Sequence, residues 1–146
     1  MPSEAPQQHH ARCYCGATTL SIKAAAITVA YCHCDDCKRW TGAPLPAFAA
    51  FPEAAVTAAP ELASPLSIVP GVDRWSCGTC HSPVAARFDY LPGQIYIPLG
   101  TLDTAERLPP AIHCHDHARY DWLHIQDDLP RSGGSGRDSL NKATPT

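Results

Sequence analysis

Cysteine spacing constrains this chain more than any other feature of its sequence. Seven of the eight cysteines form two pairs and one triplet: Cys13 and Cys15; Cys77 and Cys80; and Cys32, Cys34 and Cys37. Thiolates so close along a chain converge on a small volume, which suits a soft divalent metal such as zinc with its tetrahedron of ligands. The two pairs can complete one such site. The triplet offers three thiolates and leaves a fourth position open.

An even number of cysteines in a small protein would also fit four disulfides. However, residues 1–10 are polar and contain no hydrophobic signal core. We therefore expect the chain to stay in the cytoplasm, where thiols remain reduced. Apolar residues make up 45% of the sequence, which is enough for a hydrophobic core without covalent cross-links. These features favour metal binding over disulfides.

Composition also excludes two classes of partner. The formal net charge is −3, and the basic residues are scattered along the 146-residue chain. We therefore expect no binding to a nucleic-acid backbone. The longest apolar stretches are short and interrupted by proline, so we expect no membrane-spanning segment.

The pattern of apolar residues predicts one mainly-β domain built from short strands. The 15 prolines and 9 glycines favour many turns and few long helices. Strands are predicted over residues 17–23, 27–31, 44–51 (an edge strand), 83–88, 94–99 and 111–118. A hairpin through residues 23–26 would bring the first two cysteine clusters together. A short helical turn is predicted over 35–42, capped by Asp35 or Asp36.

Composition separates both ends of the chain from this body. Residues 1–10 are interpreted as a flexible lead, and the Ser/Gly-rich residues 131–146 as a disordered tail. Residues 120–129 carry several apolar side chains, and we expect them to pack back on the body.

The two cysteine pairs favour a closed, structural zinc site, because four thiolates leave no room for a substrate. The alternative for Cys77 and Cys80 is a redox dithiol, but such dithiols begin a helix in a βαβ unit, and no such unit is predicted.

The triplet leaves two interpretations open. On an extended segment Cys32 and Cys34 face one side while His33 faces the other, and the following turn can bring in Cys37. Three protein ligands with an open position are typical of catalytic zinc. The alternative is a second structural site, with a distant histidine or Cys114 as the fourth ligand.

At this point the sequence resembles the glutathione-dependent formaldehyde-activating enzyme family, which includes centromere protein V-like members. The segments that carry the resemblance are CYCGA at 13–17, YCHCDDC at 31–37, GVDRWSCGTC at 71–80, LGTLD at 99–103 and WLHIQDDLP at 122–130. Together they span about residues 11–130. One departure is His81, which follows the second pair where the family usually has glycine.

The resemblance implies an Mss4-like fold of short antiparallel sheets held by a structural zinc site. It also implies two zinc ions per chain. Cys13, Cys15, Cys77 and Cys80 would hold structural zinc, and Cys32, Cys34 and Cys37 a labile, catalytic zinc. The activity implied is the joining of glutathione and formaldehyde to S-hydroxymethylglutathione, a carbon–sulfur lyase reaction in reverse. The alternatives are a non-catalytic zinc module or glutathione carrier, and a thiol-based redox or metal sensor.

Three alternating histidines and one further cysteine complete the candidate metal ligands. On a strand, His113, His115 and His117 would share one face, either as an extra metal site or as a partly exposed polar surface. Cys114 would point the opposite way and is expected to be a small buried hydrophobe.

Several cations and aromatic residues lie near the cysteines in sequence. Lys38, Arg39 and Arg74 could bind the carboxylates of glutathione or be ordinary surface charges. Trp40 and Trp75 could line a pocket or belong to the core.

Overall fold

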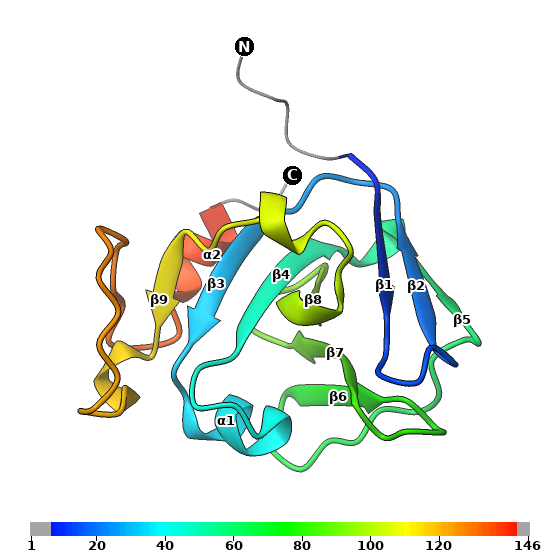
Figure 1. Cartoon of the computed structure of the whole chain (residues 1–146), viewed down its shortest axis with the longest axis horizontal. Coiled ribbons are helices and arrows are strands. Elements are labelled where there is room, and N and C mark those ends of the chain that lie inside the picture. The colour runs from blue at the N-terminus through cyan, green and yellow to red at the C-terminus, as the bar shows by residue number, and fades with distance from the viewer. Residues whose placement is uncertain (1–6, 143–146) are drawn as a thin grey trace.

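Two β-sheets make up most of the structure. The computed structural model describes residues 7–142, and in that part of the chain a three-stranded sheet has the order β1-β2-β5 and a six-stranded sheet the order β6-β7-β8-β4-β3-β9 (Figure 1). The small sheet contains β1 (His9–Arg12), β2 (Thr19–Ile22) and β5 (Val56–Ala59). The large sheet contains β3 (Thr28–Cys32), β4 (Ala47–Pro52), β6 (Val72–Ser76), β7 (Pro83–Phe88), β8 (Gln94–Pro98) and β9 (Ile112–Cys114).

The mainly-β prediction is therefore confirmed. All the paired strands are antiparallel except β3 and β9, which run parallel, so the large sheet is mixed. The helices are short: α1 (Asp35–Thr41), α2 (Arg137–Lys142) and the 3₁₀ turns η1 (Glu53–Ala55), η2 (Leu99–Thr101), η3 (Ala105–Arg107) and η4 (Asp116–Ala118). Among the described residues, no helix is long and apolar enough to cross a bilayer.

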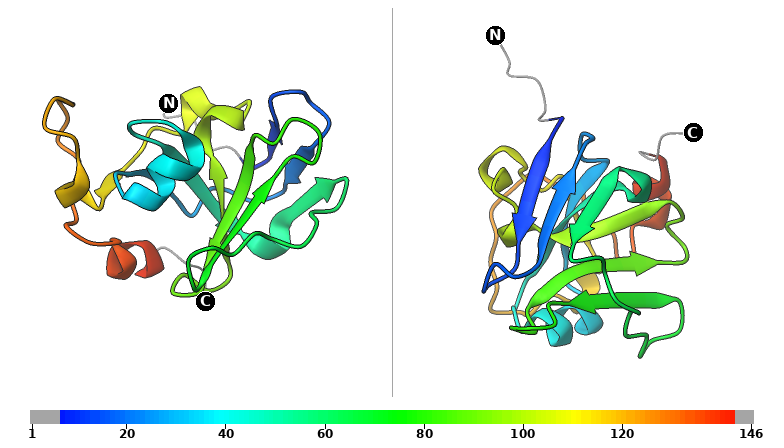
Figure 2. Two further views of the ribbon diagram at one scale, coloured as in Figure 1. Left: turned by 90° about the horizontal axis from the view of Figure 1, so that it is seen from below. Right: turned by 90° about the vertical axis from the view of Figure 1, so that its right-hand side faces the viewer.

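The large sheet has a hydrophobic core on each face. In the left view of Figure 2 the small sheet lies on one side of the large sheet, and α1 and α2 lie on the other. Strand β4 serves both cores, because successive side chains of a strand point to opposite faces. Ala49 and Phe51 belong to the core beneath the small sheet, and Phe48 and Ala50 to the core beneath α2.

One strand, β4, was predicted at a sheet edge, but it lies in the middle of the large sheet because both its faces are buried. The segment 44–51 was expected at a sheet edge because it contains prolines. Strand β4 instead lies in the middle of the sheet, between β3 and β8, and Phe48 to Phe51 are all buried. Pro44 and Pro46 precede the strand and Pro52 ends it, so no proline interrupts the central hydrogen bonding.

The hairpin predicted through residues 23–26 is also wrong. Strand β2 belongs to the small sheet and β3 to the large one, so the connection passes from one sheet to the other. Strand periodicity identified both strands but carries no information on which partner each one selects.

Both predicted ends of the body need correction. His9 and His10 lie in β1, and His9 is fully buried, so the flexible lead predicted over 1–10 does not extend that far. The tail predicted to be disordered over 131–146 contains α2, and Leu140 is 4% exposed. Residues 1–6 and 143–146 lie outside the described residues.

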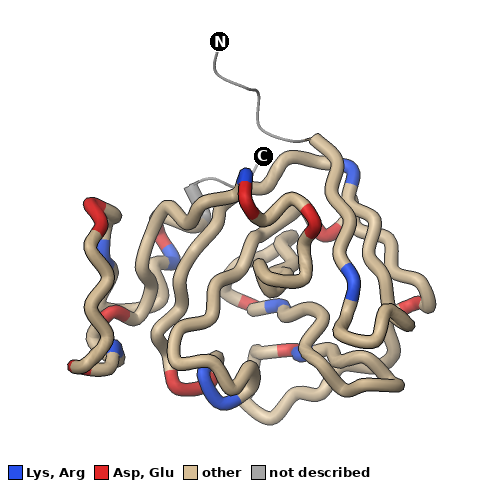
Figure 3. The backbone as a smooth tube through the Cα atoms, in the orientation of Figure 1, with Lys and Arg blue, Asp and Glu red and all other residues tan. Residues whose placement is uncertain are grey.

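The charged residues are interspersed over the surface. Figure 3 shows Lys and Arg alternating with Asp and Glu over the tube, rather than gathering on one side. Several are ion pairs, such as Arg87 with Glu53 and Asp73 at 2.6 and 2.7 Å.

The central position of β4 can be tested with Phe51, which is fully buried. Phe51→Ala is expected to lower the free energy of unfolding by about 3–5 kcal/mol, because it removes buried apolar surface and leaves a cavity. Leu66→Ala is the control, because Leu66 is 61% exposed. Denaturant unfolding of both variants measures the effect. Equal stabilities would contradict the placement of β4.

Candidate metal centres

The two cysteine pairs meet where the two sheets join. Cys13 and Cys15 lie in the turn after β1, and Cys77 and Cys80 in the turn between β6 and β7. Their four sulfur atoms lie within 4.8 Å of one another. The Cys13–Cys15 and Cys15–Cys77 sulfurs are 3.7 and 3.8 Å apart. Sulfurs at the corners of a tetrahedron around zinc are separated by about 3.8 Å, so this cluster fits a four-thiolate zinc site.

Backbone N–H groups surround these sulfurs. Thr18 N–H donates to Cys13 Sγ at 3.3 Å, and Thr79 N–H and Cys80 N–H donate to Cys77 Sγ at 3.3 and 3.5 Å. Such donors stabilise the thiolate form. They lower the pKa of Cys77 to about 5, with the N–H of Cys80 as the largest cause. The Ser82 hydroxyl helps to lower the pKa of Cys80 to about 7. The turn therefore favours the thiolate forms of Cys77 and Cys80, which are the forms that bind a metal cation.

His81 closes this turn in a strained conformation. Its φ is 63°, in the left-handed region that favours glycine, and its N–H donates to the carbonyl of Cys77 at 2.9 Å. Histidine thus replaces the family's usual glycine at a position where any side chain lowers the stability of the folded protein.

His81→Gly is expected to raise the free energy of unfolding by about 0.5–1 kcal/mol. Relief of left-handed strain contributes about 1–2 kcal/mol, and the greater freedom of unfolded glycine offsets about 0.5–1 kcal/mol of it. His81→Ala is the matched control, because alanine keeps the Cβ that causes the strain. Thermal unfolding of the three proteins measures the difference, and an equal gain in the alanine variant would rule out this explanation.

The triplet lies at the end of β3 and the start of α1. Cys32 ends β3, Cys34 is the N-cap of α1, and Cys37 lies in its first turn. The backbone N–H of Cys37 donates to Cys34 Sγ at 3.3 Å, so Cys34, and not Asp35 or Asp36, caps the helix. Sulfur can replace the usual oxygen acceptor here because the backbone of Cys34 is extended.

The three sulfurs are close enough to share a ligand. Cys32 Sγ is 3.3 Å from Cys34 Sγ and 3.2 Å from Cys37 Sγ. Hydrogen bonds from Cys32 and Cys37 hold the pKa of Cys34 well below its usual range, and the pKa of Cys32 is raised by the same contacts. Without a cation, only part of the cluster can ionise, because adjacent thiolates repel one another. A soft dication would allow all three to ionise, so the donor set fits zinc.

Arg74 lies directly beside the triplet. Its guanidinium is 2.6 Å from Asp36 Oδ2 and 3.6 Å from Cys37 Sγ, and it stacks 4.5 Å from the centre of the Trp40 ring. Only 7% of Arg74 is exposed. It is therefore not an ordinary surface charge, and its buried Nη1 has no hydrogen-bond partner among the described residues.

The other predicted cations and aromatic residues take different places. Lys38 is also buried, with Nζ 2.9 Å from the carbonyl of Ala118 and 3.8 Å from the centre of the Tyr120 ring. Arg39 alone of the three cations is exposed. Trp75 belongs to the core beneath the small sheet, whereas Trp40 packs against the other core.

A narrow cavity of about 40 Å³ adjoins the triplet. Its wall contains the three cysteines and the aromatic side chains of Phe48, Phe88, Tyr90 and Tyr96. Burial raises the pKa of both tyrosines, so their phenols stay protonated. The cavity is thus a neutral, largely apolar space with sulfur atoms on one side.

Cys114 also lines this cavity. It is 4% exposed, as predicted for a small buried hydrophobe, and burial raises its pKa to about 11. In the parallel pairing of β3 with β9, its Cα is opposite that of Cys32. The group of mutually close sulfurs nevertheless contains Cys32, Cys34 and Cys37 without Cys114.

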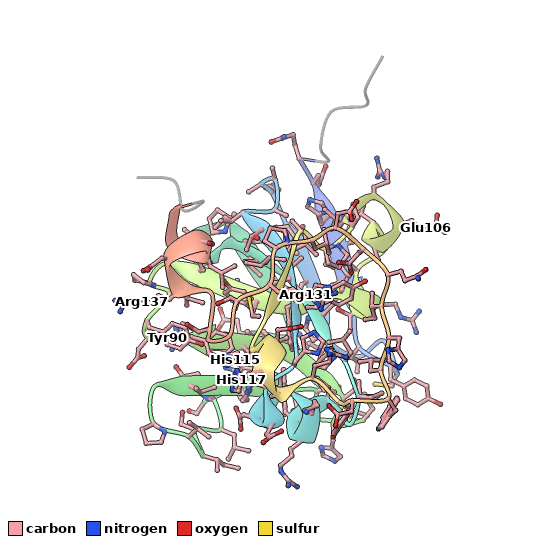
Figure 4. The ribbon with its side chains drawn as sticks, turned by 90° about the vertical axis from the view of Figure 1, so that its left-hand side faces the viewer. Tyr90, Glu106, His115, His117, Arg131 and Arg137 are labelled. Atoms are coloured by element: carbon pink, nitrogen blue, oxygen red, sulfur yellow. The ribbon has the colours of Figure 1, made fainter. Side chains whose placement is uncertain are left out.

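The predicted row of three histidines does not form, because β9 ends at Cys114. Only His113 lies in the strand, His115 is left-handed with φ 54°, and His117 is in η4. Figure 4 shows His115 and His117 near the end of β9.

A different histidine cluster forms behind the triplet. His33, His113 and Asp116 have ligand atoms within 4.8 Å of one another. His33 Nε2 and His113 Nδ1 are 2.8 Å apart, and His113 Nε2 is 2.8 Å from Asp127 Oδ2. Burial lowers the pKa of His33 to about 4, so its imidazole is neutral. The alternation of a strand predicted that His33 faces away from Cys32 and Cys34. It could not predict the contact with His113, which is 80 residues away in sequence.

Hydrogen bonds and ion pairs already satisfy much of this cluster. Asp116 Oδ1 is 2.7 Å from Arg131 Nη1, so its charge is compensated. The group therefore serves to join β3, β9 and the segment that follows.

These features define a class: a mainly-β protein with one cluster of four cysteines and one of three, each suited to a soft metal. The model of the family described as glutathione-dependent formaldehyde-activating enzyme matches residues 8–118, and the chain belongs to this family. A crystal structure of a Rhodobacter sphaeroides protein is similar, with a TM-score of 0.52 and 15% identity over 84% of this chain and 99% of that one. This likeness supports the fold alone. No curated protein matches the chain.

Proposed function

We propose that this protein is a zinc-dependent carbon–sulfur lyase that joins glutathione and formaldehyde to S-hydroxymethylglutathione. The observation that carries the proposal is the triplet of sulfurs, 3.2 and 3.3 Å apart, on the wall of a cavity. Family membership supplies the reaction class. Free thiols are essential to this function, which is why we place the protein in a reducing compartment such as the cytoplasm.

We assign different roles to the two cysteine clusters. Cys13, Cys15, Cys77 and Cys80 would hold a structural zinc ion, whose binding free energy contributes to folding. Cys32, Cys34 and Cys37 would hold a second, more labile zinc with an open position. The chain would thus bind two zinc ions.

The reaction forms a bond between the thiol sulfur and the carbonyl carbon of formaldehyde. The sulfur loses a proton, the C=O double bond becomes a single bond, and the oxygen gains a proton. When bound, zinc supplies the positive charge that favours a thiolate, the nucleophilic form of a thiol. The neutral aromatic wall made by Phe48, Phe88, Tyr90 and Tyr96 would exclude water and favour an uncharged reactant such as formaldehyde.

Arg74 would tune the triplet through its contact with Cys37. Contacts with the neighbouring cysteines and burial leave the pKa of Cys37 raised, and the guanidinium of Arg74, 3.6 Å from Cys37 Sγ, opposes that rise. Asp36 holds the guanidinium in place at 2.6 Å. Arg74 is therefore assigned a positioning role.

Arg74→Met is expected to weaken zinc binding at the triplet by about 10- to 100-fold, which is typical for loss of a residue that supports a ligand. Arg87→Met is the matched control, because Arg87 also forms ion pairs with carboxylates, Glu53 and Asp73, away from the cysteines. Competition with a fluorescent chelator measures the affinity of each protein. Equal losses in both variants would contradict the assignment.

Cys34→Ser is expected to abolish acceleration of the reaction, because it removes a thiolate ligand of zinc while serine can still cap α1. Glutathione adds to formaldehyde spontaneously, so the rate and not the equilibrium must be measured, for example by exchange NMR with ¹³C-formaldehyde. Ile68→Ser is the control, because Ile68 is 78% exposed.

The same assay distinguishes the alternative functions. Acceleration by wild-type protein that persists in Cys34→Ser would remove the triplet from the mechanism. A lack of acceleration by wild-type protein would leave a non-catalytic zinc module or glutathione carrier. The close sulfurs would also suit a redox sensor, which would release zinc from the triplet at low peroxide concentration.

A further inference from the structure

Two hydrogen-bonded histidines lie behind the triplet, and the proposed reaction does not use them. His33 Nε2 is 2.8 Å from His113 Nδ1, and His113 Nε2 is 2.8 Å from Asp127 Oδ2. Both rings are fully buried, and His33 stands between Cys32 and Cys34 in the sequence. A buried hydrogen bond of this kind fixes the orientation of both partners, because breaking it leaves an unsatisfied polar group in the core.

The chemistry of these groups gives the hydrogen bonds a direction. The contact with His113 is the largest cause that lowers the pKa of Asp127, so this side chain is a carboxylate and accepts. His113 Nε2 therefore donates, and in the neutral ring its Nδ1 accepts the N–H of His33. His33 Nδ1 is buried and has no hydrogen-bond partner in the part of the chain that the structure describes. Among those residues, the orientation of the His33 ring thus depends on one hydrogen bond, to His113.

The ring of His113 contacts both neighbours of Cys32. Strands β3 and β9 lie side by side (Figure 1), and the Cα of Tyr31 is opposite that of His113. The His113 ring stacks on Tyr31 with 4.7 Å between ring centres, and on His33 with 5.1 Å. Because side chains alternate along a strand, Tyr31 and His33 share one face and Cys32 points to the other. His113 therefore holds the strand on both sides of Cys32.

The distance between two sulfurs of the triplet shows why this backbone must be held. Residues i and i+2 of an extended strand are separated by about 6.6 Å along the chain. Cys32 Sγ and Cys34 Sγ are only 3.3 Å apart, so the two side chains lean toward each other across His33. A rotation of the backbone at His33 would turn one sulfur away from the other. A contact to the His33 side chain is thus well placed to keep the two sulfurs together.

His113 is itself firmly held. Its backbone N–H donates to the carbonyl of Pro130, and its carbonyl accepts from the N–H of Ser132, each at 2.9 Å. Asp127, the acceptor for the ring, also accepts from the N–H of Leu129 at 3.0 Å. The backbone of His113 is therefore bonded to the segment that follows β9, while its ring reaches β3.

We propose that His113 is a positioning residue for the triplet. Its contacts with Tyr31 and His33 fix the backbone around Cys32. The sulfurs of Cys32 and Cys34 therefore face a common point before a metal binds. This inference rests on the proposed function, because it assumes that the triplet holds zinc. Ligands that are already in place lose less conformational freedom on binding, and the metal is bound more tightly.

Titration of the triplet with cobalt(II) tests this role. A mild chelator first removes the labile metal from the reduced protein, and Co²⁺ is then added. Charge-transfer absorption from thiolate to Co²⁺ reports binding by sulfur and gives the affinity. The variant is His113→Leu, which removes both the hydrogen bonds and the aromatic ring. His113→Asn is the conservative variant, because its side-chain oxygen can still accept from His33.

His9→Leu is the matched control for the loss of a buried histidine. His9 is also fully buried, and its Nδ1 is 2.6 Å from Thr104 Oγ1. Its ring packs against Phe51, which belongs to the core beneath the small sheet. The substitution therefore removes similar contacts on the opposite face of the large sheet. Denaturant unfolding gives the stability of each variant.

We expect His113→Leu to weaken Co²⁺ binding at the triplet by about 10- to 100-fold, which is typical for loss of a residue that supports a ligand. His113→Asn should weaken it by less than about fivefold, because the contact with His33 is kept. His9→Leu should lower stability but change the affinity by less than about twofold, because its contacts are distant from the triplet.

Asp127→Ala tests the same hydrogen bonds should His113→Leu fail to fold. The Asp127 side chain is 19% exposed, so its removal leaves no large cavity. The His113 ring loses the acceptor that orients it, and Co²⁺ binding at the triplet should weaken by at least about threefold. Asp128→Ala is the control, because Asp128 is the exposed neighbouring carboxylate and should leave the affinity unchanged.

Wild-type affinity in folded His113→Leu, or in Asp127→Ala where the former does not fold, would overturn the proposal. An equal loss in His9→Leu would also overturn it, because this would indicate general destabilisation. So would an equal loss in His113→Asn, because the contact with His33 would then not be the cause.

The titration separates this role from the proposed catalysis, because it needs neither glutathione nor formaldehyde. If His113 sets the Co²⁺ affinity but the protein does not accelerate the reaction, the proposed function fails and the positioning role remains. If the protein accelerates the reaction while His113→Leu binds Co²⁺ as wild type does, only the positioning role fails.

Discussion

The meeting of four sulfur atoms at the junction of two sheets is the constraint on which the architecture depends. Cys13 and Cys15 belong to the turn of the small sheet, and Cys77 and Cys80 to a turn of the large one. Backbone N–H groups point at these sulfurs and favour their charged form. Four adjacent thiolates repel one another unless a cation lies between them. In our account, metal binding and the docking of the two sheets are therefore a single event.

The second cluster uses the same type of ligand in different surroundings. Cys32, Cys34 and Cys37 come from one short stretch of chain, so they hold together no distant elements. They adjoin a cavity with aromatic walls and are supported by Arg74 and Asp36. The first cluster has four sulfurs, enough to complete a tetrahedral zinc site, and the second has three sulfurs beside a cavity. That difference in surroundings, and not in ligand chemistry, separates the structural role we propose from the catalytic one.

Local patterns predicted much of this structure. Strand periodicity located β2, β3, β7 and β8, and cysteine spacing identified both clusters, because these signals depend on neighbours in sequence. Long-range pairing was less predictable. Strand β4 is central because both its faces are buried, and His33 meets His113 across 80 residues. The C-terminal segment looked disordered by composition, since Leu140 is the one buried residue over 131–140, the part of the segment whose burial the structure describes. One leucine among glycines and polar residues gives no periodic signal.

Metal analysis combined with X-ray absorption spectroscopy at the zinc edge tests the central claim most directly. The account predicts two zinc ions per chain in freshly purified protein. The averaged spectrum should contain both a four-sulfur site and a site with three sulfurs and one lighter ligand, and a mild chelator should remove only the latter. Protein that contains no zinc, or whose clustered cysteines are joined as disulfides by mass mapping, would contradict the account.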